Sequence, residues 1–572
     1  MTDFSAKKHF PYFSDNAKQV YLDSAATTQR LGAVIEVTRQ AMAENNATVH
    51  RAAYKKASEA TVAYENVRQN VASWINARQD EIVFTSGATE SLNMIAAGIH
   101  APMLNGTKIL VCASEHHANL LPWQALASRL DLSIEVLPLE QDGVFSEATW
   151  ERWSTLVTQD VCLIACAHVS NVLGNIYPVK ALCQLAEQNQ ALTIIDGTQA
   201  LAHLSVDVAD IGCDFYVFSG HKMYGPTGTG VLFGRYSCLT GLLPSKLGGE
   251  MVSAVSYERF TTQNPPLKFE AGTPNVSGVI ALGEALYFLR EHMTQIVQHE
   301  RTLCKLLMSR LKTIKHLRVL GNPLQQHGHS TNGNPQDTIG IVSFVLEQQD
   351  NHSIVQQLWQ EGIALRYGHH CAMPLLQTLS VGACIRVSIG AYTDEQDILR
   401  FVETLQRILR QSEGDLASIE NDSSYSEQTK CGKACGTQLD KPIIEQIVNI
   451  AEARDWSTKH RGLLLLSKIL PILPEEERNA NSELLGCESA VWLTNDSLVG
   501  WRAYSDSKVI RGILTLLITY STHEALLAEA VGLPPNKHNH SEFLDQLGLS
   551  SYFSVGRRDG VSQIIKRLAN LS

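Results

Sequence analysis

Apolar stretches of strand length alternate with helix-like segments through the first half of the chain. The stretches KILVCAS (108–114), VCLIACAHVSN (161–171), LTIID (192–196), DFYVFS (214–219) and GVLFG (230–234) follow this pattern, and PVKALCQLAEQNQ between two of them has a helical period. Continuous apolar runs separated by helices are typical of strands buried on both faces of a parallel sheet. The pattern therefore predicts an α/β fold with a mainly parallel sheet covered by helices.

A smaller unit with periodic helices is expected after about residue 280. The strand-like run IGIVSFVL (339–346) lies among these helical periods, and together they predict an α+β part packed on the larger sheet. Before this strand, GNPLQQHGHSTNGNPQD (321–337) is polar and rich in turn residues, so we expect a surface excursion there.

A sharper change in composition occurs at residues 411–442, where small polar and acidic residues dominate and large apolar residues are rare. We interpret this stretch as an interdomain linker. Beyond it, two helical patterns, a hairpin in ESAVWLTNDSLVGWRAYS and a helix opened by Ser505 and Asp506 predict a complete small α+β domain. The expected division is a first domain at 1–410, a linker at 411–440 and a second domain at 441–572.

Composition narrows the classes of function. The chain has 572 residues, too many for one compact core, and its net charge of −11 argues against nucleic acid or an anionic membrane as partner. No apolar run approaches the roughly 20 residues of a membrane span, and the N-terminus has no apolar signal core, so we expect a cytoplasmic protein. The 12 cysteines are scattered through apolar stretches, which predicts that most are reduced and buried.

The stretch SGHKMYGPTGTG (219–230) places Lys222 directly behind a histidine, at the start of a glycine-rich loop. An isolated lysine at such a junction is usually a surface charge. Asp196, however, ends a buried strand 26 residues earlier and needs a cationic partner to offset its desolvation. A protonated pyridine nitrogen supplies one, and pyridoxal phosphate needs both a lysine for its Schiff base and an acid at its ring nitrogen.

A candidate phosphate cradle lies earlier in the chain. FTSGATESLNMIAAGI (84–99) passes from a strand through a Ser-Gly-Ala-Thr turn into a helix, which presents free N–H groups and a positive dipole to an anion, with the hydroxyl of Thr89 close by. Taken alone, this turn is only a helix cap. Together with Asp196 and Lys222 it indicates phosphate binding.

These segments resemble a known family. SGHKMYGPTG, SEHHANLLPW, HVSNVLG, DGTQA, FEAGTPN and RYGHHCAMP are similar, in sequence and order, to the motifs of SufS-type cysteine desulfurases, over roughly residues 10–410. The resemblance implies an α/β fold of the fold-type I, pyridoxal-phosphate-dependent aminotransferase class. That fold has a large domain and a small α+β domain.

The family's cofactor residues can be carried over position by position. Lys222 resembles the Schiff-base lysine, Asp196 the partner of the pyridinium, His116 the ring stacked on the cofactor and Gln199 the donor to its phenolic oxygen. The phosphate ligands correspond to Ala88, Thr89, Ser219 and His221. Thr273 of FEAGTPN resembles the threonine that reaches the phosphate in the other subunit's site, which implies a homodimer.

Substrate residues follow from the same resemblance. Asn171 and Arg386 resemble the groups that hold the substrate carboxylate, and Arg366 is expected to assist them. An arginine fork matches a carboxylate bidentately, and an arginine within the apolar strand around Arg386 is costly without an anion. The alternative is that Arg386 pairs with a carboxylate of the protein itself.

Cys371 separates a desulfurase from an aminotransferase, because removal of sulfur from cysteine needs a thiolate to attack the substrate sulfur. Arg366, His369 and His370 precede it in a polar loop that contains glycine, which favours an exposed and reactive thiol. His116 is a candidate proton shuttle, although stacking and proton transfer remain alternatives. Met373 departs from the residue that the family commonly has after HHCA.

The second domain resembles another family. SELLGCESAVW is similar to the acceptor-loop segment of SufE-type sulfur-acceptor proteins, and SDSKVIRG and GRRDG follow in the family's order. Cys487 matches the acceptor cysteine, with ordinary turn packing as the alternative, and Arg557 matches a family arginine near that loop. Cys431 and Cys435 are interpreted as incidental thiols, although a relay or half of a metal site is conceivable. No bound metal is expected.

Together the two resemblances imply an enzyme that converts L-cysteine to L-alanine. A persulfide on Cys371 would pass to Cys487 for delivery to an iron–sulfur scaffold protein, within or between subunits. The alternative is a selenocysteine lyase or cysteine sulfinate desulfinase that carries the second domain as a docking module.

Overall fold

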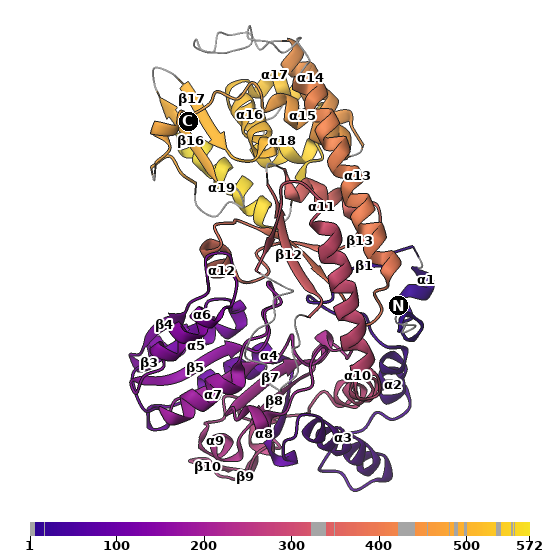
Figure 1. Cartoon of the computed structure of the whole chain (residues 1–572), viewed down its shortest axis with the longest axis vertical. Helices are drawn as coiled ribbons and strands as arrows, with labels where there is room; N and C mark the ends of the chain where they lie inside the picture. The colour runs from indigo at the N-terminus through magenta and orange to yellow at the C-terminus, as the bar shows by residue number, and fades with distance from the viewer. Residues whose placement is uncertain are drawn as a thin grey trace. The chain divides into compact units, whose positions relative to one another are not determined.

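The computed structural model describes residues 6–571 except 17, 322–338, 348, 421–440, 455, 480, 485–489, 497–499, 534–538, 551–552 and 554. The expected surface excursion, most of the expected linker, Cys431, Cys435, Cys487 and the side chain of Arg557 therefore lie outside the described residues. The chain divides into two compact units, one formed by Met1–Glu347 with Leu358–Glu403 and the other by Gln348–Gln357 with Thr404–Ser572 (Figure 1). Among the described residues, no helix is long and apolar enough to cross a membrane.

The first unit is built on a seven-stranded sheet. Its strand order is β2-β8-β7-β6-β5-β3-β4, with parallel pairing from β7 to β4 and antiparallel pairing of β8 with both of its neighbours. The strands are β2 (Ile82–Thr85), β3 (Lys108–Cys112), β4 (Ser133–Leu137), β5 (Val161–Ala167), β6 (Leu192–Asp196), β7 (Phe215–Ser219) and β8 (Gly230–Gly234). The predicted mainly parallel sheet is confirmed.

The inner strands of this sheet are buried on both faces, because their successive residues enter different apolar clusters, whereas the edge strand β4 is partly exposed. On β3, Ile109 and Val111 belong to one cluster and Leu110 and Cys112 to the other. The first cluster includes residues of α4 (Ala88–Gly98) and α5 (Leu121–Leu130). The second includes residues of α3 (Lys55–Trp74), α7 (Val179–Gln188) and α10 (Val276–Leu311). The continuous apolar runs in the sequence reflect this two-sided cover.

The smaller part of this unit contains an antiparallel four-stranded sheet in the order β11-β12-β15-β14. Its strands are β11 (Leu317–Leu320), β12 (Ile341–Leu346), β14 (Arg366–Gly368) and β15 (Cys384–Ser388). Strand β1 (Val20–Tyr21) pairs in parallel with β13 (Ile363–Ala364), and β9 (Val252–Val255) forms a hairpin with β10 (Phe260–Thr262). Further helices of this unit are α1 (Tyr12–Asp15), α2 (Gly32–Ala43), α6 (Glu147–Leu156), α8 (Val208–Ile211), α9 (Tyr236–Gly241) and α12 (Met373–Thr378), whereas most of α11 (Asn351–Gln360) belongs to the second unit.

A buried ion pair ties α3 to the FEAGTPN segment. Arg68 donates to Glu270 at 2.6 and 2.9 Å, and the two side chains are 1% and 4% exposed. Glu270 also accepts the N–H of Phe84, on β2, at 2.8 Å. The pair therefore connects a helix, the sheet and the segment that leads to Thr273.

The second unit surrounds its own apolar cluster. A hairpin of β16 (Val491–Asp496) and β17 (Gly500–Ser505) accompanies the helices α14 (Lys441–Glu452), α15 (Trp456–Leu466), α16 (Lys508–Thr522), α17 (Glu524–Ala530), α18 (His540–Gln546) and α19 (Val555–Leu571). The prediction that Ser505 and Asp506 open α16 is wrong. Ser505 ends β17, and the hydroxyl of Ser507 instead accepts the N–H of Ile510, because Ser507 is the last residue with extended backbone before the helix.

Helix α13 (Glu395–Glu420) continues through residues 411–420, the first part of the stretch interpreted as a linker. Residues of high helix propensity such as Glu and Leu extend the amphipathic helix that precedes them. A low content of large apolar residues therefore does not by itself end a helix.

Candidate active site

A cavity of about 230 Å³ opens at the carboxyl ends of β2, β3, β5, β6 and β7, where ligands commonly bind in α/β sheets. It brings together 12 of the residues singled out from the sequence: Ala88, Thr89, His116, Asn171, Asp196, Gln199, Ser219, His221, Lys222, Arg366, Cys371 and Arg386. Thr273 is exposed and does not line this cavity.

Lys222 ends a short 3₁₀ helix, η5 (Gly220–Lys222), which follows β7 directly. Burial lowers the pKa of its amine to about 8, while the negative charge of Asp196 acts in the opposite direction. A lysine with a lowered pKa has a larger neutral and nucleophilic fraction at ordinary pH. The alternative of a solvated surface charge does not describe this side chain.

Asp196 ends β6 inside the cavity and is 8% exposed. Its Oδ1 accepts the N–H of Thr198 at 2.9 Å, and no cationic side chain of the described residues lies within ion-pair distance. Burial raises the pKa of this carboxyl. A ligand that brings a cationic N–H to Asp196 would satisfy it, so the pair of Asp196 and Lys222 fits pyridoxal phosphate.

The start of α4 also lines the cavity, with Ala88 and Thr89. The N–H of Ala88 donates to the hydroxyl of Ser219 at 2.8 Å, which fixes the turn against the end of β7. Gly230 makes this approach possible, because a Cβ at this position would lie 2.4 Å from the Cα of Gly87. Thr89 and His221 also line the cavity here, so the helix terminus and these polar groups suit an anion.

His116 and Gln199 are each fixed by one hydrogen bond to the backbone. Nδ1 of His116 accepts the N–H of Ala118 at 3.0 Å, and burial lowers the pKa of the ring to about 4. The ring is therefore neutral at pH 7 and carries its proton on Nε2. The amide nitrogen of Gln199 donates to the carbonyl of Ala25 at 2.8 Å, which leaves its second N–H for a ligand.

Cys371 lies in a loop with unusual backbone geometry. His370 and Cys371 both have left-handed conformations, with φ of 52° and 56°. Non-glycine residues keep such conformations only where neighbours enforce them. The amide of Asn171 donates to the carbonyl of His370 at 2.9 Å, and the N–H of His117 donates to that of Cys371 at 2.7 Å.

The predicted exposure of Cys371 is confirmed. It is the exposed thiol among the nine cysteines of the described residues, none of which forms a disulfide. The other eight are Cys112, Cys162, Cys166, Cys183, Cys213, Cys238, Cys304 and Cys384; Cys238 is half-buried and the rest are buried. The exposed Cys371 lines the same cavity as the half-buried Lys222.

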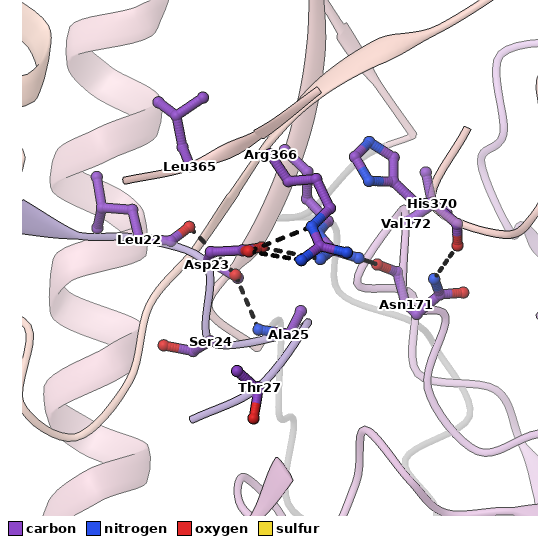
Figure 2. A network of polar contacts seen from close by, with 12 residues as sticks. Leu22, Asp23, Ser24, Ala25, Thr27, Asn171, Val172, Leu365, Arg366 and His370 are labelled. Atoms are coloured by element: carbon purple, nitrogen blue, oxygen red, sulfur yellow. Dashed lines mark hydrogen bonds and ion pairs between the residues drawn. The ribbon is translucent and has the colours of Figure 1, made fainter. Parts of the chain in front are cut away.

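A residue that sequence reasoning missed, Asp23, lies beside the two arginines of the cavity. Its Oδ1 accepts from Nη2 of Arg386 at 3.2 Å, and its Oδ2 accepts from Nε and Nη2 of Arg366 at 3.2 and 3.0 Å (Figure 2). Arg386 also donates to the carbonyl of Asn171 at 2.9 Å. Arg386 thus has the protein carboxylate considered as an alternative from the sequence, and still lines the cavity. The sequence contains one signal for this role, because an acidic residue, Asp23, directly follows the apolar stretch VYL.

The fold and this site define a class of protein, and the comparison with known families agrees. Residues 20–401 match the family described as aminotransferase class-V, and residues 444–572 match SufE, described as an Fe-S metabolism associated domain. The chain belongs to the aminotransferase class-V family and carries a SufE domain after it.

Individual relatives indicate a narrower class than the family match does, because they are named cysteine desulfurases. A probable cysteine desulfurase of Pseudomonas putida is 41% identical over 391 residues, which is 68% of this chain and 93% of that protein. A cysteine desulfurase of Klebsiella pneumoniae is 40% identical over 392 residues, with the same shares. Among solved structures, the cysteine desulfurase CsdA of Escherichia coli has a TM-score of 0.63 and 36% identity, covering 71% of this chain and 97% of that one. The enzyme of Thermococcus onnurineus has a TM-score of 0.65 and 31% identity, with the same coverage.

Proposed function

We propose that this protein is a pyridoxal-phosphate-dependent cysteine desulfurase that converts L-cysteine to L-alanine and passes the sulfur to its own SufE domain. The observation that carries the proposal is the cavity itself. It holds a half-buried lysine with a lowered pKa, a buried carboxylate without a cationic partner among the described residues, and an exposed cysteine sulfur.

Lys222 would hold the cofactor covalently, and Asp196 would face its ring nitrogen. His116 would stack on the ring, Gln199 would donate its free N–H to the phenolic oxygen, and the phosphate ligands would be Ala88, Thr89, Ser219 and His221. When bound, pyridoxal phosphate supplies an electron sink for bond cleavage at the substrate's α-carbon. Thr273 would serve the partner subunit's phosphate site in a homodimer.

The substrate carboxylate would bind at Arg386, with Asn171 and Arg366 beside it, because a guanidinium matches a carboxylate in geometry and charge. The Sγ of Cys371, as a thiolate, attacks the substrate sulfur. A sulfur–sulfur bond forms while the carbon–sulfur bond breaks, and a proton delivered to the substrate carbon releases alanine. His116 would move that proton, and its neutral ring with the proton on Nε2 supports this role.

Sulfur would then leave by thiol exchange. The thiolate of Cys487 attacks the outer sulfur of the Cys371 persulfide, the old sulfur–sulfur bond breaks, and Cys371 is regenerated as a thiolate. We assign residues 1–410 to the desulfurase, 441–572 to the acceptor and the intervening stretch to the connection. The recipient in this proposal is an iron–sulfur scaffold protein in the cytoplasm, and the match to a domain associated with Fe-S metabolism supports the link to iron–sulfur clusters.

The test is to incubate the purified protein, loaded with pyridoxal phosphate, with L-cysteine. Alanine is quantified, and persulfides are mapped by mass spectrometry after alkylation. We expect stoichiometric alanine and sulfur, with persulfide on Cys371 and Cys487. Alanine formation without any protein-bound persulfide would contradict the relay, and no alanine at all would contradict the desulfurase.

A further inference from the structure

The carbonyl oxygen of His221 attracts several donors from the segment that follows β1. The N–H of Thr28 donates to it at 3.0 Å, the hydroxyl of Thr28 at 3.1 Å and Nη1 of Arg30 at 3.3 Å. The hydroxyl of Thr27 also lies 3.2 Å from this oxygen. A carbonyl oxygen has two lone pairs, so the four donors compete for it.

The hydroxyl of Thr27 has a second acceptor within reach. Nδ1 of His221 lies 3.2 Å from Oγ1 of Thr27, and no other group of the described residues bonds to that nitrogen. Nη2 of Arg30 donates to the same Oγ1 at 3.1 Å and occupies one of its lone pairs. A hydroxyl has a single proton to donate. Because three other donors already serve the carbonyl oxygen, the favoured direction of the Thr27 proton is toward Nδ1.

The direction of this proton sets the tautomer of the ring. Burial, with the charges of Lys222 and Arg30 nearby, lowers the pKa of His221 to about 4, so the imidazole is neutral at pH 7. A neutral imidazole has one N–H donor and one acceptor nitrogen. When Nδ1 accepts from Thr27, the ring proton is on Nε2. His221 lines the cavity and Thr27 does not, so Nε2 is the nitrogen left for a ligand.

We propose that Thr27 is a positioning residue that fixes the tautomer of His221, so that the Nε2–H donates to the phosphate of the cofactor. The proposal rests on the proposed function, because it takes His221 as a phosphate ligand. The opposite tautomer would present a lone pair to phosphate oxygens that are ionised and act as acceptors. Arg30 supports the arrangement, because its N–H holds the hydroxyl oxygen of Thr27 and leaves the hydroxyl proton for the ring.

The test compares pyridoxal phosphate with pyridoxal, which lacks the phosphate. The full-length protein, freed of cofactor, is titrated with each compound, and absorbance gives the two dissociation constants. Thr27→Val keeps the shape of the side chain but removes the hydroxyl. It should weaken binding of pyridoxal phosphate about tenfold and change binding of pyridoxal by less than about twofold, because a hydrogen bond to a charged group is impaired.

Two further variants control for the loss of the hydroxyl itself. Thr27→Ser keeps the hydroxyl and should keep the wild-type ratio of the two dissociation constants. Thr38→Val makes the same change at a half-buried threonine of α2, whose hydroxyl donates to the carbonyl of Val34, and should also keep the ratio. An equal loss of affinity for both compounds in Thr27→Val would indicate a purely structural role and overturn the proposal.

A double variant decides whether Thr27 acts through the ring. In His221→Ala the ring is absent, so the addition of Thr27→Val should change the ratio by less than about twofold. Additive losses would overturn the proposal, as would a wild-type ratio in Thr27→Val or a wild type that binds both compounds equally. Alanine formation from L-cysteine is measured separately on the wild type. Its absence would contradict the proposed desulfurase, whereas the ratio of dissociation constants still decides the role of Thr27.

Discussion

The backbone N–H of His117 donates a 2.7 Å hydrogen bond to the carbonyl oxygen of Cys371. This bond joins the turn that carries His116 to the loop that carries the exposed sulfur. Together with the bond from Asn171 to His370, it holds two consecutive left-handed residues in place through backbone atoms. The position of the sulfur is therefore set by the chain around it and not by contacts of the sulfur itself.

Cys371→Ser should consequently keep the loop and the cofactor but lose the nucleophile. We expect alanine production from L-cysteine to fall by at least about 100-fold, because a hydroxyl at neutral pH is a far weaker nucleophile toward sulfur than a thiolate. Alanine is measured by chromatography, and cofactor content by absorbance. Cys238→Ser, at a half-buried cysteine far along the chain, is the control and should remain active. Full activity of Cys371→Ser would exclude it from catalysis.

Lys222→Ala should remove covalent attachment of the cofactor. Borohydride reduction of the wild type, followed by digestion, should give a peptide with Lys222 that carries the mass of pyridoxal phosphate. The variant should give no such peptide, whereas Lys180→Ala, a partly exposed lysine on α7, should give it unchanged. A labelled peptide at another lysine in the wild type would show that the assignment of Lys222 is mistaken.

The lowered pKa of Lys222 predicts how the stability of the cofactor-free protein depends on pH. The folded value is about 8 and the ordinary value 10.5, so between these values the unfolded chain binds more protons than the folded one. The contribution of this group to folding stability therefore rises as pH rises from about 8 to 10. Below pH 8 its burial costs on the order of 3 kcal/mol.

Urea unfolding at pH 7.5 and pH 10 measures this effect. The difference in unfolding free energy between Lys222→Met and the wild type should shrink by about 2 to 3 kcal/mol toward pH 10, because Met has no proton to lose. Comparing each protein with itself at two pH values removes the contribution of the methionine side chain. Parallel pH profiles would show that the amine titrates at its ordinary pKa in the folded protein.

Arg68→Met should destabilise the first unit by about 3–5 kcal/mol, because it leaves Glu270 as a buried charge without its partner. The double variant Arg68→Met with Glu270→Met should lose less than the single one, since no unpaired charge remains. Chemical denaturation of the full chain measures both. Arg78→Met breaks an exposed pair with Asp80 and should change little. If the double variant is less stable to unfolding than Arg68→Met, the hydrogen bond from Phe84 to Glu270 contributes more to stability than the ion pair does.

Cys487→Ser tests the relay. One round of alanine formation should proceed at the wild-type rate, because Cys371 is intact, and steady-state turnover without an added thiol should then slow. Tethering keeps an acceptor at an effective concentration on the order of millimolar, which the variant loses. Rapid-quench measurement separates the two phases, and Cys431→Ser is the control. An unaltered steady-state rate would make the SufE domain a docking module.

The parts of this fold that were predicted correctly are those with strong local signals. Strands β3, β5, β6 and β7 are long apolar runs with two buried faces, and each was located within a few residues. The residues that line the cavity were located because Lys222, Asp196 and Thr89 follow strands whose carboxyl ends meet at one edge. The roles of those residues stay predictions until the variants are measured.

The features that the sequence did not predict correctly, Asp23 and the cap of α16, have a different physical origin. Asp23 lies more than 340 positions from the arginines that it accepts from, and only the register of β14 with β15 reveals that two arginines share its carboxylate. The cap of α16 was misplaced by two residues because three polar residues in a row, Ser505 to Ser507, are all acceptable caps. Local preference cannot decide between them, whereas the end of the β17 pairing does.

The absence of a side chain at Gly230 has a mechanical consequence. Strand β8 backs the turn before α4 so closely that a single methyl group at this position would overlap the Cα of Gly87. The turn therefore cannot shift toward β8 when an anion binds to its N–H groups. The conformation of the turn is fixed when the sheet folds, so ligand binding does not require a further loss of conformational entropy in the turn.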